Sequence, residues 1–166
     1  MRGLMAMVLV LAAGCTPVEL RSPPTAGVPV AIEGDSISYA TGPCYGTCPV
    51  YKVTVRPDGT GTFEGERFTA VTGSRAFRVT PEEYRRFAAA LEPYRPDGER
   101  RVEMGSPDCG AAPTDMPSVD VNWAMASGGA GHLHFYYGCR VGNAAMAEAL
   151  RNAPTLLPIA DLIGKR

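Results

Sequence analysis

Residues 50–65 read VYKVTVRPDGTGTFEG, a strand–turn–strand pattern from which the rest of the fold can be worked out. Apolar and polar side chains alternate from Val50 to Arg56, which is the period of a strand with one buried face. Asp58-Gly59 then favours the positive φ angles that a tight hairpin needs. Residues 60–65 run back along the first segment, so the stretch predicts an antiparallel hairpin.

The segments on either side extend this hairpin into a sheet. Alternation predicts a preceding strand at 36–41, and two further alternating segments follow at 67–71 and 74–79. A second hairpin is predicted from 119–125 and 133–137, because these alternating segments flank a glycine-rich turn. Each of these strands has one apolar face, which predicts a sheet with one side against a core.

The polar segment from Arg95 to Pro117 separates the first helix from the second hairpin. It contains four prolines and three glycines and shows no helical or strand period, so we predict a long loop. Loops of this length are often functional, but we favour a surface excursion pinned by Cys109.

Two helices are predicted. Thr80 can cap the first, Pro81 suits its first position, and Glu83 completes a capping box. Its apolar stripe consists of Tyr84, Phe87, Ala88 and Leu91. Asn143 is a plausible cap for the second helix, predicted at 144–152. This order predicts an α+β fold, with a mostly antiparallel sheet and two helices packed on one face. The apolar tail at 156–163 is expected to pack back on the domain.

The first fifteen residues read MRGLMAMVLVLAAGC and have the features of an export signal. One positive charge at Arg2 precedes an apolar run at 4–13, which is too short to span a bilayer. The small residues before Cys15 resemble a lipobox, where a lipid such as palmitate is attached to the cysteine and cleavage precedes it. By the same resemblance, Thr16 favours the outer membrane. An ordinary signal peptide, with Cys15 incidental, is the alternative.

These features divide the chain into three parts. We predict a lipoprotein signal peptide at 1–14, a tether at 15–31 rich in Pro, Ser and Thr, and a single α+β domain at 32–166. The protein is then expected to be exported and anchored to the outer membrane through Cys15, facing the periplasm.

Four further cysteines remain, and an even number in an exported chain predicts disulfides. Of the three possible pairings we favour Cys44 with Cys48, which flank a short turn, and Cys109 with Cys139, which lie beside the second hairpin. A redox pair at Cys44 and Cys48 is the alternative, but dithiol motifs have two intervening residues and a following helix. A zinc site is less favoured, because the oxidising compartment favours disulfides.

The candidate ligand-binding residues are His132 and His134, whose side chains point the same way from one strand. With Asp120 or Asp115 nearby, they could bind a ligand or a metal. Two polar residues on the solvent face of a hairpin explain them equally well. No third metal ligand is identified, so no metal site is assigned.

Other classes of chemistry lack a sequence signature. The chain has no Gly-x-Ser-x-Gly elbow and no glycine-rich loop that precedes a helix. Its formal net charge of −1 supplies no electrostatic reason for nucleic-acid binding. We therefore assign no catalytic residue and no cofactor.

Residues 42–51, GPCYGTCPVY, followed by the Asp58-Gly59 hairpin, resemble an uncharacterised bacterial family, domain of unknown function 6438. The likeness extends from Ile37 to Ile163 and includes the helix at 84–91 and the sequence Asp115-Met116-Pro117. The family implies an exported domain with no assigned activity. Cys109 and Cys139 are additions to its pattern.

Taken together, these observations favour an envelope lipoprotein whose domain is a non-catalytic binding or structural module. Its expected partners are the membrane, through the lipid on Cys15, and an envelope protein or small ligand. The alternative is a periplasmic thiol–disulfide protein that uses Cys44 and Cys48.

Overall fold

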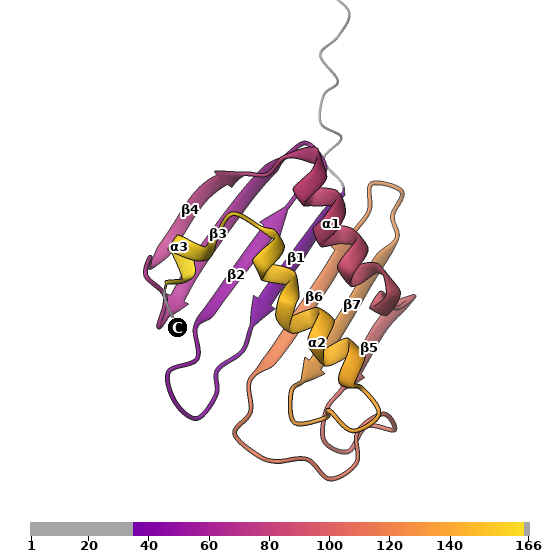
Figure 1. Cartoon of the computed structure of the whole chain (residues 1–166). Coiled ribbons are helices and arrows are strands. Elements are labelled where there is room, and N and C mark those ends of the chain that lie inside the picture. Colours follow the sequence, from indigo (N-terminus) through magenta and orange to yellow (C-terminus); the bar gives the residue numbers. More distant parts are fainter. Residues whose placement is uncertain (1–34, 165–166) are drawn as a thin grey trace, which may run out of the picture. The chain divides into compact units, whose positions relative to one another are not determined.

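A seven-stranded sheet forms the framework of the domain in the computed structural model, which describes residues 35–164 (Figure 1). The strand order is β4-β3-β2-β1-β6-β7-β5. Every neighbouring pair is antiparallel except β5 and β7, which are parallel. The strands are β1 (Ser36–Thr41), β2 (Val50–Val55), β3 (Thr60–Arg67), β4 (Gly73–Arg78), β5 (Gly98–Val102), β6 (Ser118–Ala124) and β7 (Ala130–Tyr136). The predicted α+β class and the mostly antiparallel sheet are confirmed.

The hairpin of β2 and β3 forms as predicted, with Val53 opposite Phe63. Gly59 has a φ of 82°, and its N–H donates to the carbonyl of Arg56 over 3.0 Å. The hydroxyl and the backbone N–H of Thr60 both donate to Asp58, and these hydrogen bonds lower the pKa of that carboxyl. The turn is therefore closed by the residues that predicted it.

Helix α1 (Pro81–Leu91) begins with the predicted capping box. The backbone N–H of Thr80 donates to Glu83 Oε2 over 2.7 Å, and Glu83 N–H donates to the Thr80 hydroxyl over 3.2 Å. The first of these bonds, together with the Thr80 hydroxyl, lowers the pKa of Glu83. Phe87 and Leu91 are fully buried, so the predicted stripe supplies the core face.

Helix α2 (Ala144–Asn152) has its predicted bounds, but its predicted cap is corrected. Asn143 precedes the helix without capping it through its side chain. Its Nδ2 instead donates to the carbonyls of Asp108 and Cys139, over 2.8 and 3.0 Å. One of these carbonyls precedes Cys109 and the other belongs to Cys139, so the amide bonds to the chain around the Cys109–Cys139 disulfide instead of to the start of the helix.

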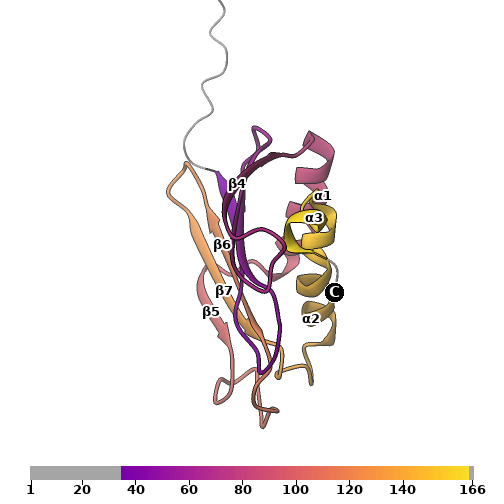
Figure 2. The same ribbon diagram turned by 90° about the vertical axis from the view of Figure 1, so that its left-hand side faces the viewer.

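Figure 2 shows the ribbons of α1, α2 and α3 (Ala160–Ile163) on the same side of the sheet. Two short 3₁₀ turns, η1 (Glu92–Tyr94) and η2 (Ala153–Leu156), follow α1 and α2. The hydroxyl of Tyr39 on β1 donates to the carbonyl of Leu150 over 2.9 Å, which ties α2 to the sheet. The third helix was not predicted, because four residues are too few for a helical period. Among residues 35–164, no helix has the length and apolar character needed to cross a membrane.

Two predicted segments are wrong. Residues 95–117 contain β5, which lies parallel to β7 at the sheet edge, instead of forming one loop. Residues 67–71 do not form a strand of their own: Arg67 ends β3 and the chain then bends. The N–H groups of Ala70 and Val71 donate to carbonyls of α3 instead of to a strand, which also confirms that the apolar tail packs back on the domain. The predicted signal peptide, Cys15 and the tether lie outside the described residues.

Candidate functional site

The turn from Gly42 to Pro49, called the cysteine turn below, joins β1 to β2. A disulfide links Cys44 to Cys48, whose Cα atoms are 5.8 Å apart, as predicted. Gly46 has a φ of 134°, a conformation that side chains rarely allow. The N–H of Gly42 donates to Ser118 over 2.8 Å, and a side chain at Gly42 would collide with the Ser118 hydroxyl. These contacts hold the turn in one position. Thiol–disulfide exchange by this pair stays a prediction.

The second predicted disulfide joins Cys109 to Cys139, with Cα atoms 5.1 Å apart. Both cysteines are buried. The bond attaches the segment between β5 and β6 to the chain between β7 and α2. Both cysteines belong to the hydrophobic core, so the bond has a structural place there.

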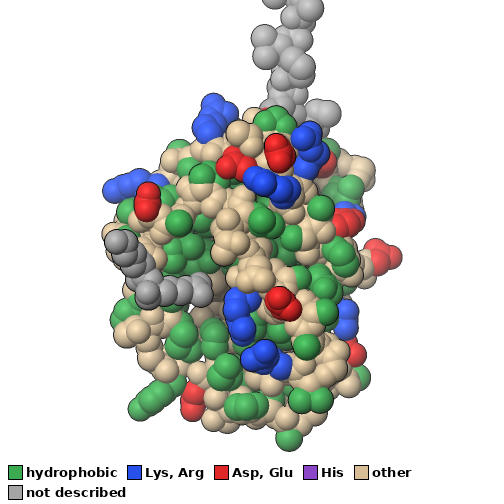
Figure 3. Space-filling model, in the orientation of Figure 1, with side chains coloured by type: hydrophobic (Ala, Val, Ile, Leu, Met, Phe, Trp, Pro, Cys, Tyr) green, Lys and Arg blue, Asp and Glu red, His purple; other side chains and the backbone are tan. Residues whose placement is uncertain are grey.

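A cavity of about 760 Å³ lies beside the cysteine turn. One wall consists of Cys44, Thr47 and Cys48 from that turn. The rings of Tyr39 and Tyr51 also line it. Figure 3 shows apolar side chains gathered at the lower left of this side of the molecule, over the turn. The volume lies within the roughly 300–1,000 Å³ typical of small-molecule sites.

Stacked aromatic rings support the floor of this cavity. The ring centroids of Tyr39 and Tyr51 are 6.4 Å apart, and those of Tyr51 and Phe63 are 5.5 Å apart. All three residues are at least 98 % buried. Neighbouring strands place them in line on the core face, so they form a rigid base.

Tyr137 and Arg151 also line the cavity. The guanidinium carbon of Arg151, in the last turn of α2, lies 5.2 Å from the centroid of the Tyr137 ring. This is a cation–π distance. Among the described residues that line the cavity, Arg151 is the one Lys, Arg, Asp or Glu. Arg151 therefore supplies the formal charge in the described lining.

Two exposed aromatic side chains complete the lining. Tyr45 is 89 % exposed at the tip of the cysteine turn, and Phe68 is 53 % exposed in the β3–β4 connection. Phe68 also has a φ of 56°, which is a costly conformation for a bulky residue. Exposed aromatics and local strain both concentrate at binding sites.

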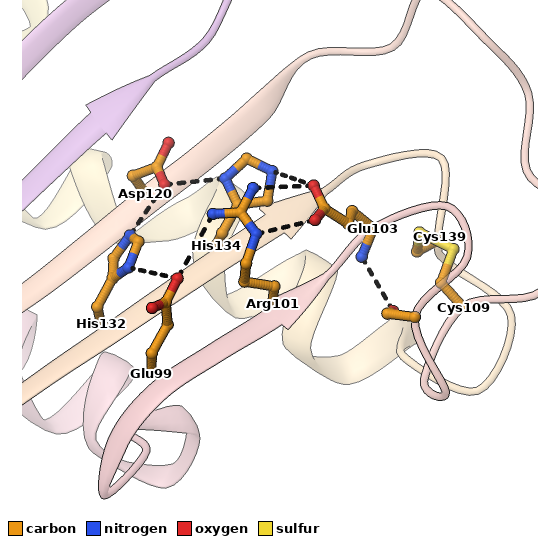
Figure 4. A network of polar contacts seen from close by, with 9 residues as sticks. Glu99, Arg101, Glu103, Cys109, Asp120, His132, His134 and Cys139 are labelled. Atoms are coloured by element: carbon orange, nitrogen blue, oxygen red, sulfur yellow. Dashed lines mark hydrogen bonds and ion pairs between the residues drawn. A yellow bond between two sulfur atoms is a disulfide. The ribbon is translucent and has the colours of Figure 1, made fainter.

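The predicted histidines form a different site, on β7 (Figure 4). Asp120 Oδ1 lies 3.0 Å from His132 Nε2 and 2.9 Å from His134 Nδ1, so one carboxylate oxygen serves both rings. The other ring nitrogens face two further carboxylates, at 3.6 Å from Glu99 on β5 and 3.7 Å from Glu103 just after that strand. Strand register produces this cluster, since Asp120 lies opposite His134 and Glu99 opposite His132.

Arg101 closes the histidine cluster on the β5 side. Its Nε and Nη2 donate to the two carboxylate oxygens of Glu103, over 2.8 and 2.9 Å. This bidentate pair lowers the pKa of Glu103 and raises that of Arg101. Each histidine thus lies among carboxylates that already have partners. Within residues 35–164, no group of three or more His, Cys, Asp or Glu is arranged to hold a metal ion.

Asp115, the other predicted ligand-binding residue, makes no hydrogen bond to either histidine among the described residues. Its Oδ2 accepts a hydrogen bond from Thr114 over 3.1 Å. It shares a smaller cavity of about 410 Å³ with Glu103, His134 and Tyr136. Asp120, the alternative acidic residue, is therefore the partner of the histidines.

The larger cavity was not predicted from the sequence. Its cysteine turn was identified for a disulfide, for an alternative redox pair and for the family resemblance, but not as the wall of a cavity, and Arg151 was not singled out at all. One usable signal was Tyr45 inside the cysteine turn, because aromatic side chains on loops often contact ligands.

Residues 35–157 match a family model described as a domain of unknown function, DUF6438. No curated protein matches the chain. The matched region runs from β1 to the segment after η2 and includes the cysteine turn, Tyr137 and Arg151. Since the match covers more than half of the chain, the protein belongs to the DUF6438 family.

Proposed function

We propose that this protein is an envelope lipoprotein whose domain is a non-catalytic binding module, with a small ligand held beside the cysteine turn. The observation that carries the proposal is the cavity of about 760 Å³ walled by that turn. Its walls combine apolar rings with a few hydroxyl groups and one guanidinium, which is the composition typical of ligand sites.

The chemistry of the lining favours binding over catalysis. Cys44 and Cys48 are joined to each other, so neither supplies a thiolate in this state. The described lining contains no histidine or carboxylate to act as a general base. The rigid aromatic floor and the two exposed aromatic side chains are suited to holding a ligand by apolar contact.

The binding proposal is tested with N-phenyl-1-naphthylamine, an uncharged aromatic probe that fluoresces when it leaves water. One molecule should bind per protein. Thr47→Trp should raise the dissociation constant at least about tenfold, because the indole ring fills the cavity from its wall.

The matched control for this test is Ser127→Trp. Ser127 is exposed in the β6–β7 turn, which Figure 1 shows at the opposite end of the sheet from the cysteine turn. This variant should bind the probe like the wild type. No fluorescence change with the wild type, or equal binding by Thr47→Trp, would overturn the proposal.

The export part of the proposal rests on the lipobox-like sequence that ends at Cys15. Cells that express the full chain and are fed an alkyne analogue of palmitate should label the wild type. Cys15→Ala should lose the label, while Cys44→Ala, which keeps Cys15, should retain it. An unlabelled wild type, or a labelled Cys15→Ala variant, would contradict lipid attachment at this residue.

A further inference from the structure

We infer that the ligand of the cavity beside the cysteine turn is a small organic anion: an acidic group attached to an apolar, preferably aromatic, body. This inference rests on the proposed function and names the chemical class that this site accepts. It assigns Arg151 as the residue that binds the acidic group.

The charge of the lining is the first argument. Among residues 35–164, Arg151 forms no ion pair with an Asp or Glu side chain, and it is the one arginine of the described lining. No carboxylate lines the cavity in the described part of the chain. A ligand carboxylate, sulfonate or phosphate could therefore pair with this guanidinium without displacing a carboxylate of the described lining.

The position of Arg151 is the second argument. A cation in the last turn of a helix is explained by the helix dipole alone. That explanation does not account for the ring of Tyr137 beneath the guanidinium. Tyr137 is 94 % buried, and its ring makes an edge contact with Phe135, with centroids 5.3 Å apart. The ring face thus holds Arg151 at the cavity wall, where its N–H groups can donate to two oxygens of one acid.

The aromatic lining is the third argument, and it specifies the rest of the ligand. Tyr45 and Phe68 expose apolar surface on two different connections that border the same cavity. Neither side chain belongs to the hydrophobic core or to the partly buried residues packed against it. An anion without an apolar body would leave these rings in water, so inorganic phosphate or acetate should bind far more weakly.

The inference is tested with two probes that differ by one group. 8-Anilinonaphthalene-1-sulfonate has the aromatic frame of N-phenyl-1-naphthylamine with an added sulfonate. Arg151→Gln should raise the dissociation constant of the sulfonate about tenfold or more and that of the neutral probe less than about twofold. Arg151→Lys, which keeps the charge but not the planar fork, should lie between the wild type and Arg151→Gln.

Arg85→Gln is the matched control, because Arg85 is an exposed arginine on α1 that does not line the cavity. It should change neither dissociation constant. If the wild type binds neither probe, the proposed function fails and the inference fails with it. If the wild type binds the neutral probe and Arg151→Gln weakens both probes equally, or neither, the binding module stands and the anionic ligand class is overturned.

Discussion

Phe63→Ala is expected to lower the free energy of unfolding by about 3–5 kcal/mol, the range for removing a buried aromatic ring. Phe63 lies on β3 opposite Val53 and has no exposed surface. Its ring stacks on Tyr51 at 5.5 Å and 23°. The variant loses the ring's burial and leaves a void next to Tyr51, which the paired strands cannot close without breaking their register.

Urea denaturation measures this loss, and Phe68→Ala is its matched control. Both substitutions remove a phenyl ring, Phe63 from the middle of β3 and Phe68 from the residue that follows this strand, but Phe68 is 53 % exposed. Surface substitutions usually change stability by about 0.5 kcal/mol or less, so Phe68→Ala should stay near the wild type. Equal losses for the two variants, or a loss below about 1 kcal/mol for Phe63→Ala, would contradict the place of Phe63 in the core.

The predictions from sequence that succeed are those based on local chemistry. Asp58-Gly59 closes its hairpin, and the capping box of α1 begins that helix, because each needs only residues within a few positions of one another. The disulfide pairing follows from similar reasoning. Cys44 and Cys48 flank one turn, while Cys109 and Cys139 flank one hairpin.

The predictions that fail have a common physical cause, because contacts with distant parts of the chain decide the structure of those segments. β5 has the sequence GERRV, and only Val102 within it is buried. This segment is a strand because it pairs in parallel with β7, so the pattern of its own side chains does not predict a strand. The segment around Phe68 alternates like a strand but bonds to α3 instead, and its backbone has a positive φ that no pattern of hydrophobicity reveals.

The two candidate sites also differ in how far the sequence predicts them. His132 and His134 lie on one strand, so the sequence predicts their common direction, and the cross-strand register supplies Asp120. The cavity instead joins the cysteine turn to Arg151, about a hundred residues later in the chain. Packing of α2 against β1, through the Tyr39 hydroxyl and Leu150, brings that arginine near the turn. No spacing rule contains this information.

The second large effect is expected from the disulfide between Cys109 and Cys139. The double variant Cys109→Ala/Cys139→Ala should lose about 3–4 kcal/mol, since the bond joins residues 30 positions apart. Without the bond, the unfolded chain is no longer closed into a loop and gains conformational entropy, which stabilises the unfolded state. Alanine at both positions avoids placing new hydroxyl groups where the two sulfurs are buried.

The matched comparison is Cys44→Ala/Cys48→Ala, whose bond joins residues only four apart. The same loop-entropy relation gives about 2 kcal/mol, so the longer loop should cost more in urea denaturation. The probes should show the reverse order. Opening the cysteine turn removes a cavity wall and should weaken probe binding. Cys109 and Cys139 do not line the cavity, so removing their bond should leave binding unchanged in the folded fraction. If the two double variants lost equal stability and equal probe affinity, the division between a structural disulfide and a site-forming one would be wrong.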